Sequence, residues 1–422
     1  MSSSASAASA SHLSSLLLRK CLLSYIHMTP PERKWLMVRD IMIDFAERTG
    51  LSPEVLSPER YLWTDSFAVC NFLGLYRKTG DEQYRRLALL LVDQVHAVLG
   101  RHRKDDERFG WISGLDEEEG RRHPTIGGLR IGKELKERRP AEPLDEHLEW
   151  DRDGQYFHYL TQWMHALDCV SFATGDSTVN RWALELAKAA NAGFTYAPQE
   201  GKRKRLYWKM SIDLSYPLVS SMGHHDPLEG LITYSELQAT SGRLSRKLPP
   251  EKLGEEISDM VTICEGKDWS TDDPLGIGGL LAGAYRMAEL IVAGSFPHRD
   301  LFQGVLEDSL RSLGSFGGQS LLNLPAYHRL AFREFGLSIG LQATQRLQDL
   351  AGRYPEVFGK FSGLIQKLAR YAGLSEEINA FWLKDKNRES ATWAEHFNIN
   401  MVMLATSLDP DGYFSISHLP TA

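Results

Sequence analysis

Short clusters of acidic, aromatic and histidine side chains recur along this chain, and each comes directly before a stretch with helical periodicity. The six clusters occupy residues 61–65, 149–153, 223–227, 269–274, 327–334 and 392–396. Two carboxyl groups can act as general acid and base on one glycosidic bond. Flat aromatic rings beside them can stack on the apolar face of a sugar. The clusters therefore predict acid/base chemistry on a carbohydrate at one shared end of these helices.

The densest cluster extends from Glu149 to His158. Its acids Glu149, Asp151 and Asp153 could serve as acid, base or nucleophile. Tyr156 and His158 are expected in the first turns of the following helix. The alternative needs no substrate: Asp153 caps the helix, and Arg152 pairs with a neighbouring acid. Both interpretations stay open.

Residues 223–229 read Gly-His-His-Asp-Pro-Leu-Glu. Asp226 and Glu229 lie three positions apart, so a helix beginning there presents both carboxyls along one edge. His224 and His225 suit acid/base work or substrate contact. Adjacent histidines do not easily bind one ion, and no further ligand spacing matches a zinc motif, so we expect no metal.

Two adjacent acids, Asp272 and Asp273, precede Pro274, which is a favoured first residue of a helix. One acid is expected to cap the helix, which leaves the other available. Arg333 and Glu334 are expected to form a structural ion pair. The glycines of 127–132 lack the strand–loop–helix context of a phosphate loop, so no cofactor is expected.

The residues expected to act on a substrate come from all these clusters. The catalytic candidates are Asp65, Asp153, Asp226, Asp272 and Asp273, assisted by His158, His225 and His396. The candidates for binding the substrate are Trp63, Glu149, Trp150, Tyr156, His224, Glu229, Trp269, Trp393 and Glu395.

Hydrophobic periodicity predicts twelve helices in six pairs. They are expected at 32–48, 61–78, from Asp81, at 153–173, from Asp176, and near 224–240, 250–264, 274–292, 298–315, 326–347, 354–372 and 391–407. The helices behind the clusters are apolar on most sides and are expected inside, whereas their partners are amphipathic. This predicts an all-α (α/α)6 toroid of six inner and six outer helices. Residues 100–152 are expected to form a lid-like loop, and 195–223 a short strand or hairpin.

This pattern resembles the six-hairpin, or (α/α)6-toroid, proteins, and Trp63-Thr64-Asp65 is similar to their aromatic–Asp helix starts. That group includes glycosidases, unsaturated glucuronyl hydrolases and sugar isomerases of the N-acylglucosamine 2-epimerase type. The 149–158 block is also similar to uncharacterised bacterial proteins. The resemblance covers residues 32–410 at the level of architecture and implies carbohydrate chemistry, but no motif here is specific to one enzyme family.

The leading hypothesis is a glycoside hydrolase that uses two carboxylates. The alternatives are a cofactor-free sugar epimerase with His225 and His396 as opposed proton carriers, a terpenoid or polyketide dehydratase or cyclase, and a non-catalytic helical scaffold. Two facing carboxyls, two facing histidines or a filled centre would distinguish hydrolysis, isomerisation and a scaffold.

Composition narrows the partners of this 422-residue chain. A net charge of −7 disfavours nucleic acid and anionic membranes, which leaves a small-molecule substrate, and the oligomeric state is left open. Four cysteines form no disulfide framework. We expect a flexible tail at 1–31, one domain at 32–422 and no stretch long enough to span a bilayer. A cytoplasmic location is expected, with mitochondrial targeting as the alternative because the first acid is Glu32.

Overall fold

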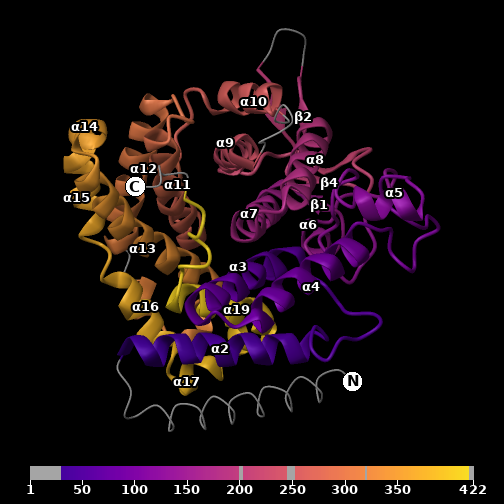
Figure 1. The fold of residues 1–422 in the computed structure, drawn as a ribbon, viewed down its shortest axis with the longest axis horizontal. Helices are drawn as coiled ribbons and strands as arrows, with labels where there is room; N and C mark the ends of the chain where they lie inside the picture. The colour runs from indigo at the N-terminus through magenta and orange to yellow at the C-terminus, as the bar shows by residue number, and fades with distance from the viewer. Residues whose placement is uncertain (1–29, 199–202, 245–251, 319–320, 418–422) are drawn as a thin grey trace. The chain divides into compact units, whose positions relative to one another are not determined.

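The computed structural model describes residues 30–198, 203–244, 252–318 and 321–417 (Figure 1). The predicted tail therefore lies almost wholly outside the described residues. The helices are α2 (Pro30–Arg48), α3 (Leu62–Thr79), α4 (Glu82–Leu99), α5 (Glu117–Arg122), α6 (Glu146–Glu149), α7 (Phe157–Thr174), α8 (Ser177–Phe194), α9 (Asp226–Leu244), α10 (Gly254–Cys264), α11 (Pro274–Val292), α12 (Arg299–Gly318), α13 (Ala331–Arg353), α14 (Pro355–Phe358), α15 (Ser362–Ala369), α16 (Leu374–Trp382), α17 (Asp385–Arg388), α18 (Ala391–Glu395) and α19 (Phe397–Leu408). The predicted all-α class is confirmed.

Local capping explains why the first helical hairpins begin and end where the sequence predicts. The Asp81 carboxylate accepts a hydrogen bond from the Gln83 amide, and Asp176 does the same for Thr178. Gly80 and Gly175 end α3 and α7 in the left-handed conformation, with φ of 71° and 72°. The repeated Thr-Gly-Asp turn thus closes one helix and opens the next in both hairpins.

Other boundaries differ from the prediction. Helix α7 begins at Phe157 rather than near 153, because Gln155–Tyr156 form strand β1, which pairs with β4 (Lys209–Met210). Strand β4 also pairs with β5 (Pro217–Val219), and β2 (Thr195–Tyr196) pairs with β3 (Arg205–Leu206). These short strands confirm the hairpin expected at 195–223.

The C-terminal third is more broken than predicted. The helix expected at 354–372 is divided into α14, a 3-10 turn at Gly359–Phe361 and α15. Helices α16 and α17 were not predicted, and the helix at 391–407 is interrupted at His396. Gly359, Gly363 and Gly373 lie at or beside these breaks, where their low helix propensity favours termination.

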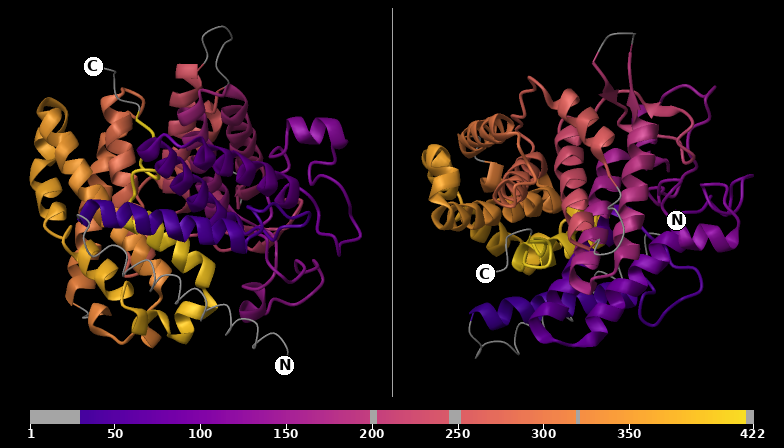
Figure 2. Two further views of the ribbon diagram at one scale, coloured as in Figure 1. Left: turned by 60° about the horizontal axis from the view of Figure 1, so that its bottom comes forward. Right: turned by 45° about the horizontal axis from the view of Figure 1, so that its top comes forward.

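The chain divides into two compact units, and the division falls within α2, α11 and α12. In unit 2 (46–269, 286–304 and 412–422), α3 packs against α4 and α7, and α9 packs against α7, α8 and α10. The three helices expected to be inner ones, α3, α7 and α9, are buried on most sides. In unit 1 (1–45, 270–285 and 305–411), α13 packs against α15, α16 and α19, the orange to yellow helices of Figure 2. Closure of six hairpins into one ring, and a single domain over 32–422, stay predictions.

Helix α11 corrects one expectation from the sequence. Over residues 274–292 it is long and apolar enough, by length and composition, to cross a bilayer. In the structure 78% of that stretch is buried, as in the core helix of a folded domain.

Candidate functional site

A row of polar pairs runs between α7 and α9 in unit 2, and we call it the α7–α9 polar seam. The pairs are His158 with Asp226, Thr161 with Glu229, His165 with Glu236, and Asp168 with Thr240. On α7 these positions are three, four and three residues apart, so they fall on one face of the helix, one turn after another. The two helices pack against each other, and their pairs follow the same order along both, so their starting ends lie together and bring residues from two predicted clusters into contact.

The lower part of the seam, around His165 and Glu236, contains a carboxylate whose charge is balanced by an arginine. The Arg286 guanidinium donates hydrogen bonds to both carboxylate oxygens of Glu236 and, at 3.1 Å, to the hydroxyl of Thr233. All three residues are buried. This bidentate pair satisfies a carboxylate that would otherwise be costly to bury.

The upper part of the seam, formed by His158, Asp226 and Glu229, has no such ion pair with a cation among the described residues. The Nδ1 atom of His158 lies 3.8 Å from Oδ1 of Asp226. Both this Nδ1 and the second carboxyl oxygen of Asp226 are buried without a hydrogen-bond partner in the described chain. Buried polar atoms almost always have partners, so two neighbouring orphans mark a place where a further polar group can bind.

Burial sets the protonation of these three groups. It lowers the pKa of His158 to about 4, so the imidazole is neutral at pH 7. Burial, reinforced by the nearby Glu229, raises the pKa of Asp226 well above its usual range. Burial also raises the pKa of Glu229 to about 7, against the opposing charge of Arg286. At neutral pH a proton acceptor, His158, thus faces a protonated acid, Asp226.

An aromatic rim surrounds His158, whose side chain is 24% exposed. The Trp63 ring lies 5.9 Å from the imidazole, and the Trp208 ring stacks near it at 6.4 Å and 20°. Tyr156 and Tyr159 complete the rim, each within 5.3 Å of His158. Trp63 and Trp208 are partly exposed, so their rings are available to a ligand that reaches His158.

Asp65, in the first turn of α3, lies close to this rim. Its carboxylate accepts a 3.0 Å hydrogen bond from the Tyr61 amide and lies 3.6 Å from the Arg60 guanidinium. Burial raises its pKa to about 6, although Arg60 opposes the shift. The Tyr61 and Tyr159 hydroxyls are 2.6 Å apart, which connects this helix start to the rim.

The predicted acids of the 149–153 cluster have structural partners instead. Asp153 is 0% exposed and accepts hydrogen bonds from Arg130 at 2.9 Å, Arg103 at 3.3 Å and the Gly132 amide at 2.9 Å. It does not cap α7, so that expectation is wrong. A carboxylate so enclosed and paired has no open side for a substrate.

Glu149 is held in the same way. Its carboxylate lies 2.8 Å from the Lys209 ammonium and 3.2 Å from the Arg138 guanidinium, and it is buried. Trp150 beside it is 51% exposed and packs edge-on against Trp208, at the outside of the rim. Glu149 therefore stabilises the wall of unit 2, whereas Trp150 extends the aromatic surface.

The histidine pair before α9 lies close to a buried ring. The Nε2 atom of His225 is 2.8 Å from the Trp269 carbonyl oxygen, and both His224 and His225 lie near the Trp269 ring. His224 is exposed, but Trp269 is only 1% exposed. Trp269 is thus a core residue rather than the stacking platform expected from the sequence.

The candidates in unit 1 are divided between structural and exposed positions. Asp273 caps α11 by accepting a hydrogen bond from the Gly276 amide, as one of the two acids before Pro274 was expected to do. It also pairs with Arg333 at 2.7 Å. Asp272 and Glu395 are exposed, and the His396 ring meets Phe332 edge-on. The epimerase hypothesis that pairs His396 with His225 involves both units and stays a prediction.

Two further expectations for unit 1 are corrected. Trp393 is 2% exposed and packs between Trp382 and Phe335, so it fills the core. Glu334 does not pair with its neighbour Arg333. It binds Arg329 and accepts a 2.8 Å hydrogen bond from the Trp382 indole.

The segment expected to be a lid, 100–152, is tied to the rest of unit 2. Arg103 and Arg130 reach Asp153, and Arg108 binds Asp106, Glu137 and, at 2.9 Å, Asp213. The Arg108–Asp213 pair joins the segment to the β4–β5 connection, whereas Asp106 and Glu137 lie within the segment itself. The segment forms a fixed wall in this structure rather than a free loop.

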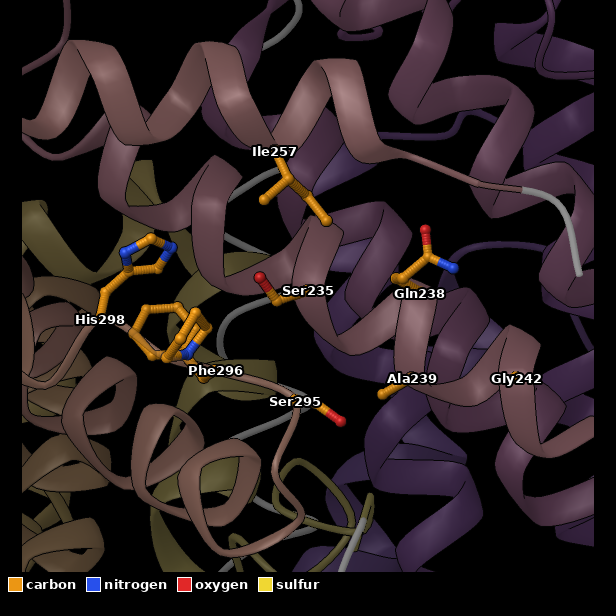
Figure 3. A pocket seen from close by; sticks show the side chains of 9 residues that line it. Ser235, Gln238, Ala239, Gly242, Ile257, Ser295, Phe296 and His298 are labelled. Carbon is orange, nitrogen blue, oxygen red and sulfur yellow. The ribbon is translucent and has the colours of Figure 1, made fainter.

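A pocket of about 430 Å³ lies at the other end of α9 (Figure 3). Ser235 and Gln238 of α9, Ile257 of α10, and Ser295, Phe296 and His298 of the α11–α12 connection line it. None of the predicted site residues takes part, and its lining contains no acid. Ser235 lies nine residues along the helix from Asp226, or about 14 Å at the helical rise. The pocket is therefore separate from the upper part of the seam, where His158, Asp226 and Glu229 lie.

Sequence reasoning missed seven residues of the seam and its surroundings. They are Tyr159, Thr161, His165, Asp168, Glu236, Thr240 and Arg286. The signal was present in the sequence: polar residues at 158, 161, 165 and 168 interrupt an otherwise apolar inner helix at helical spacing.

Comparison with known proteins adds little to this geometry. No protein-family model matches the chain, and no curated protein matches it. Among solved structures it is similar to a cellobiose 2-epimerase from Spirochaeta thermophila DSM 6192, with a TM-score of 0.46 and 13% identity over 88% of this chain and 98% of that chain. A TM-score this low carries no argument about what this chain does.

Proposed function

We propose that the chain is a cofactor-free sugar isomerase or epimerase whose acid/base pair is Asp226 and His158. The observation that supports this most is the pair of neighbouring buried atoms without partners, Nδ1 of His158 and the second carboxyl oxygen of Asp226. One belongs to a neutral base and the other to an acid whose pKa is raised by burial.

Such a pair suits proton transfer next to a carbonyl group. Asp226 donates its proton to the carbonyl oxygen of an open-chain sugar while His158 removes the proton from the adjacent carbon, which gives an enediol. Return of the two protons, with delivery to the other face or the other carbon, yields the epimer or isomer and restores both side chains. Glu229, with a pKa of about 7, can exchange protons with the site at physiological pH. Trp63 and Trp208 supply the stacking surface.

Glycoside hydrolysis is the second candidate, and the spacing of Asp226 and Glu229 favours it. They are three residues apart on one helix edge, which places their side chains about 5–6 Å apart at Cβ. Retaining glycosidases hold their two carboxyl groups about 5–5.5 Å apart, a separation that side chains with this Cβ spacing can reach. For this reaction one carboxyl must be ionised, and Glu229 with a pKa of about 7 is the one able to do so.

Incubation of the full chain with reducing monosaccharides and disaccharides in D2O distinguishes the two reactions. Isomerisation incorporates solvent deuterium at the carbon next to the carbonyl, which NMR detects, whereas hydrolysis releases new reducing ends. We expect deuterium incorporation by the native chain and its loss in His158→Gln. The matched control is His224→Gln, an exposed histidine outside the seam. Release of reducing ends without exchange would replace the isomerase proposal by the hydrolase one.

A further inference from the structure

Two cysteines and a histidine that play no part in the proposed reaction meet in the core of unit 2. Cys70 comes from α3, and His165 and Cys169 come from α7, four residues apart on one helix face. Their potential ligand atoms all lie within 4.8 Å of one another. Both thiols are 0% exposed and His165 is 2% exposed, so the cluster is shielded from water.

A main-chain oxygen completes the arrangement. The Tyr413 carbonyl lies 2.9 Å from Nε2 of His165 and 4.0 Å from Sγ of Cys169. The chain reaches this place because Gly412 packs directly on α3: a Cβ on Gly412 would lie 2.1 Å from the Cys70 carbonyl oxygen and 3.0 Å from Cα of Gly74. Only a residue without a side chain permits this approach.

We propose that Cys70, Cys169 and His165 bind a zinc ion, with the Tyr413 carbonyl as the fourth ligand. Zinc prefers four ligands in tetrahedral geometry and takes thiolate, imidazole and oxygen donors. The 3.7 Å between Sγ of Cys169 and Nε2 of His165 is close to the separation of two ligands on one tetrahedral zinc, given bonds of about 2.3 and 2.1 Å.

The surroundings of His165 match those of a metal ligand. Its other ring nitrogen, Nδ1, lies 3.6 Å from Oε2 of Glu236, which Arg286 in turn holds. Histidines that bind zinc commonly direct their second nitrogen to a carboxylate, which fixes the orientation of the ring. Glu236 and Arg286 would then orient a metal ligand, a role that they do not have in the proposed acid/base reaction.

Charge also favours a divalent ion over a monovalent one. Two thiolates balance Zn²⁺, and the Glu236–Arg286 pair is neutral by itself. A soft monovalent ion such as Cu⁺ would leave one negative charge in the core, where an uncompensated charge is costly. The ion would join α3, α7 and the segment at 412–413, so its role would be structural.

The test is the zinc content of the purified full chain. We expect one zinc ion per chain in the native protein and in Cys264→Ser, which removes a buried cysteine outside the cluster. Cys70→Ser and Cys169→Ser should each lose the ion and melt at a lower temperature. Zinc in both of these variants would overturn the proposal.

A second measurement on the native chain does not depend on whether the variants fold. After removal of zinc with a chelator, Co²⁺ should restore the melting temperature and give a thiolate-to-metal absorption band. A native chain that contains no zinc and gives no such band contradicts the proposal. So does a mass that is lower by two hydrogens in the native chain but not in Cys70→Ser or Cys169→Ser, which would show a Cys70–Cys169 disulfide.

Discussion

The cluster at 149–153, which precedes α7, and the upper α7–α9 polar seam, where α9 begins, both contain buried acids, yet the two regions differ in the partners of those acids. Asp153 and Glu149 receive four cationic side chains, Arg130, Arg103, Lys209 and Arg138. Asp226 and Glu229 receive none as an ion pair within the described residues. Instead they face a neutral histidine and a hydroxyl.

The difference shows which buried acids stabilise the fold and which do not. A carboxylate surrounded by arginines is satisfied and stays ionised, because the pairs offset its desolvation. A buried carboxyl without a cation must keep its proton, and this costs stability at neutral pH. Such a cost persists in proteins mainly where a reaction or a ligand requires it.

The largest effect on stability is expected in the 149–153 cluster, where the acids are paired with cations. Asp153→Asn removes the charge that holds Arg130 and Arg103, and breaking a buried pair costs about 3–5 kcal/mol of unfolding free energy. Urea unfolding of the full chain measures it. The exposed neighbour gives the control, since Asp151→Asn should change stability by less than about 0.5 kcal/mol. An Asp153→Asn protein as stable as the native one would remove the distinction between the two regions.

A smaller effect of opposite sign is expected for Glu229. Its pKa is raised from 4.5 to about 7, so the folded state holds a proton that the unfolded state releases. The stability that this proton contributes is full below pH 4.5 and is lost as the pH rises to about 7. Glu229→Gln should therefore unfold with a free energy about 1–3 kcal/mol higher than the native chain at pH 8, but not at pH 4. Thermal unfolding at both values checks this, and equal differences at the two would contradict it.

The smallest effect is expected where an ion pair is open to solvent. Arg333 and Asp273 lie 2.7 Å apart, but their side chains are 38% and 36% exposed. Arg333→Gln should change the unfolding free energy by less than about 1 kcal/mol. A loss as large as that of Asp153→Asn would mean that exposure does not separate weak pairs from strong ones here.

Features determined by neighbouring residues could be predicted from the sequence. The helix starts near Asp81, Asp176, Asp226 and Pro274 depend on residues within three positions, and they are confirmed. One of the two acids before Pro274 was expected to cap the helix, and Asp273 does so. Asp153 could not be interpreted in this way, since Arg130 and Arg103 lie 23 and 50 residues away in the sequence. The burial of Trp393 could not be predicted in this way either, because it depends on Trp382 of α16, which packs against it.

The polar seam could be predicted from the sequence only in part. The residues 158, 161, 165 and 168 show its spacing on α7, but not which helix faces them. Only the packing of α7 against α9 joins His158 to Asp226 and separates both from the acids at 149–153. The acid density of a cluster is therefore a weaker guide to a site than the absence of nearby cations.

The most direct test of the acid/base pair is the rate of solvent-deuterium incorporation into a reducing sugar by Asp226→Asn at pH 7. We expect a folded protein at least as stable as the native chain, with a rate lower by about 100-fold or more, the usual contribution of a positioned proton donor. A native rate in the folded variant would contradict the assignment of Asp226, and with it the proposal that the upper seam is the active site.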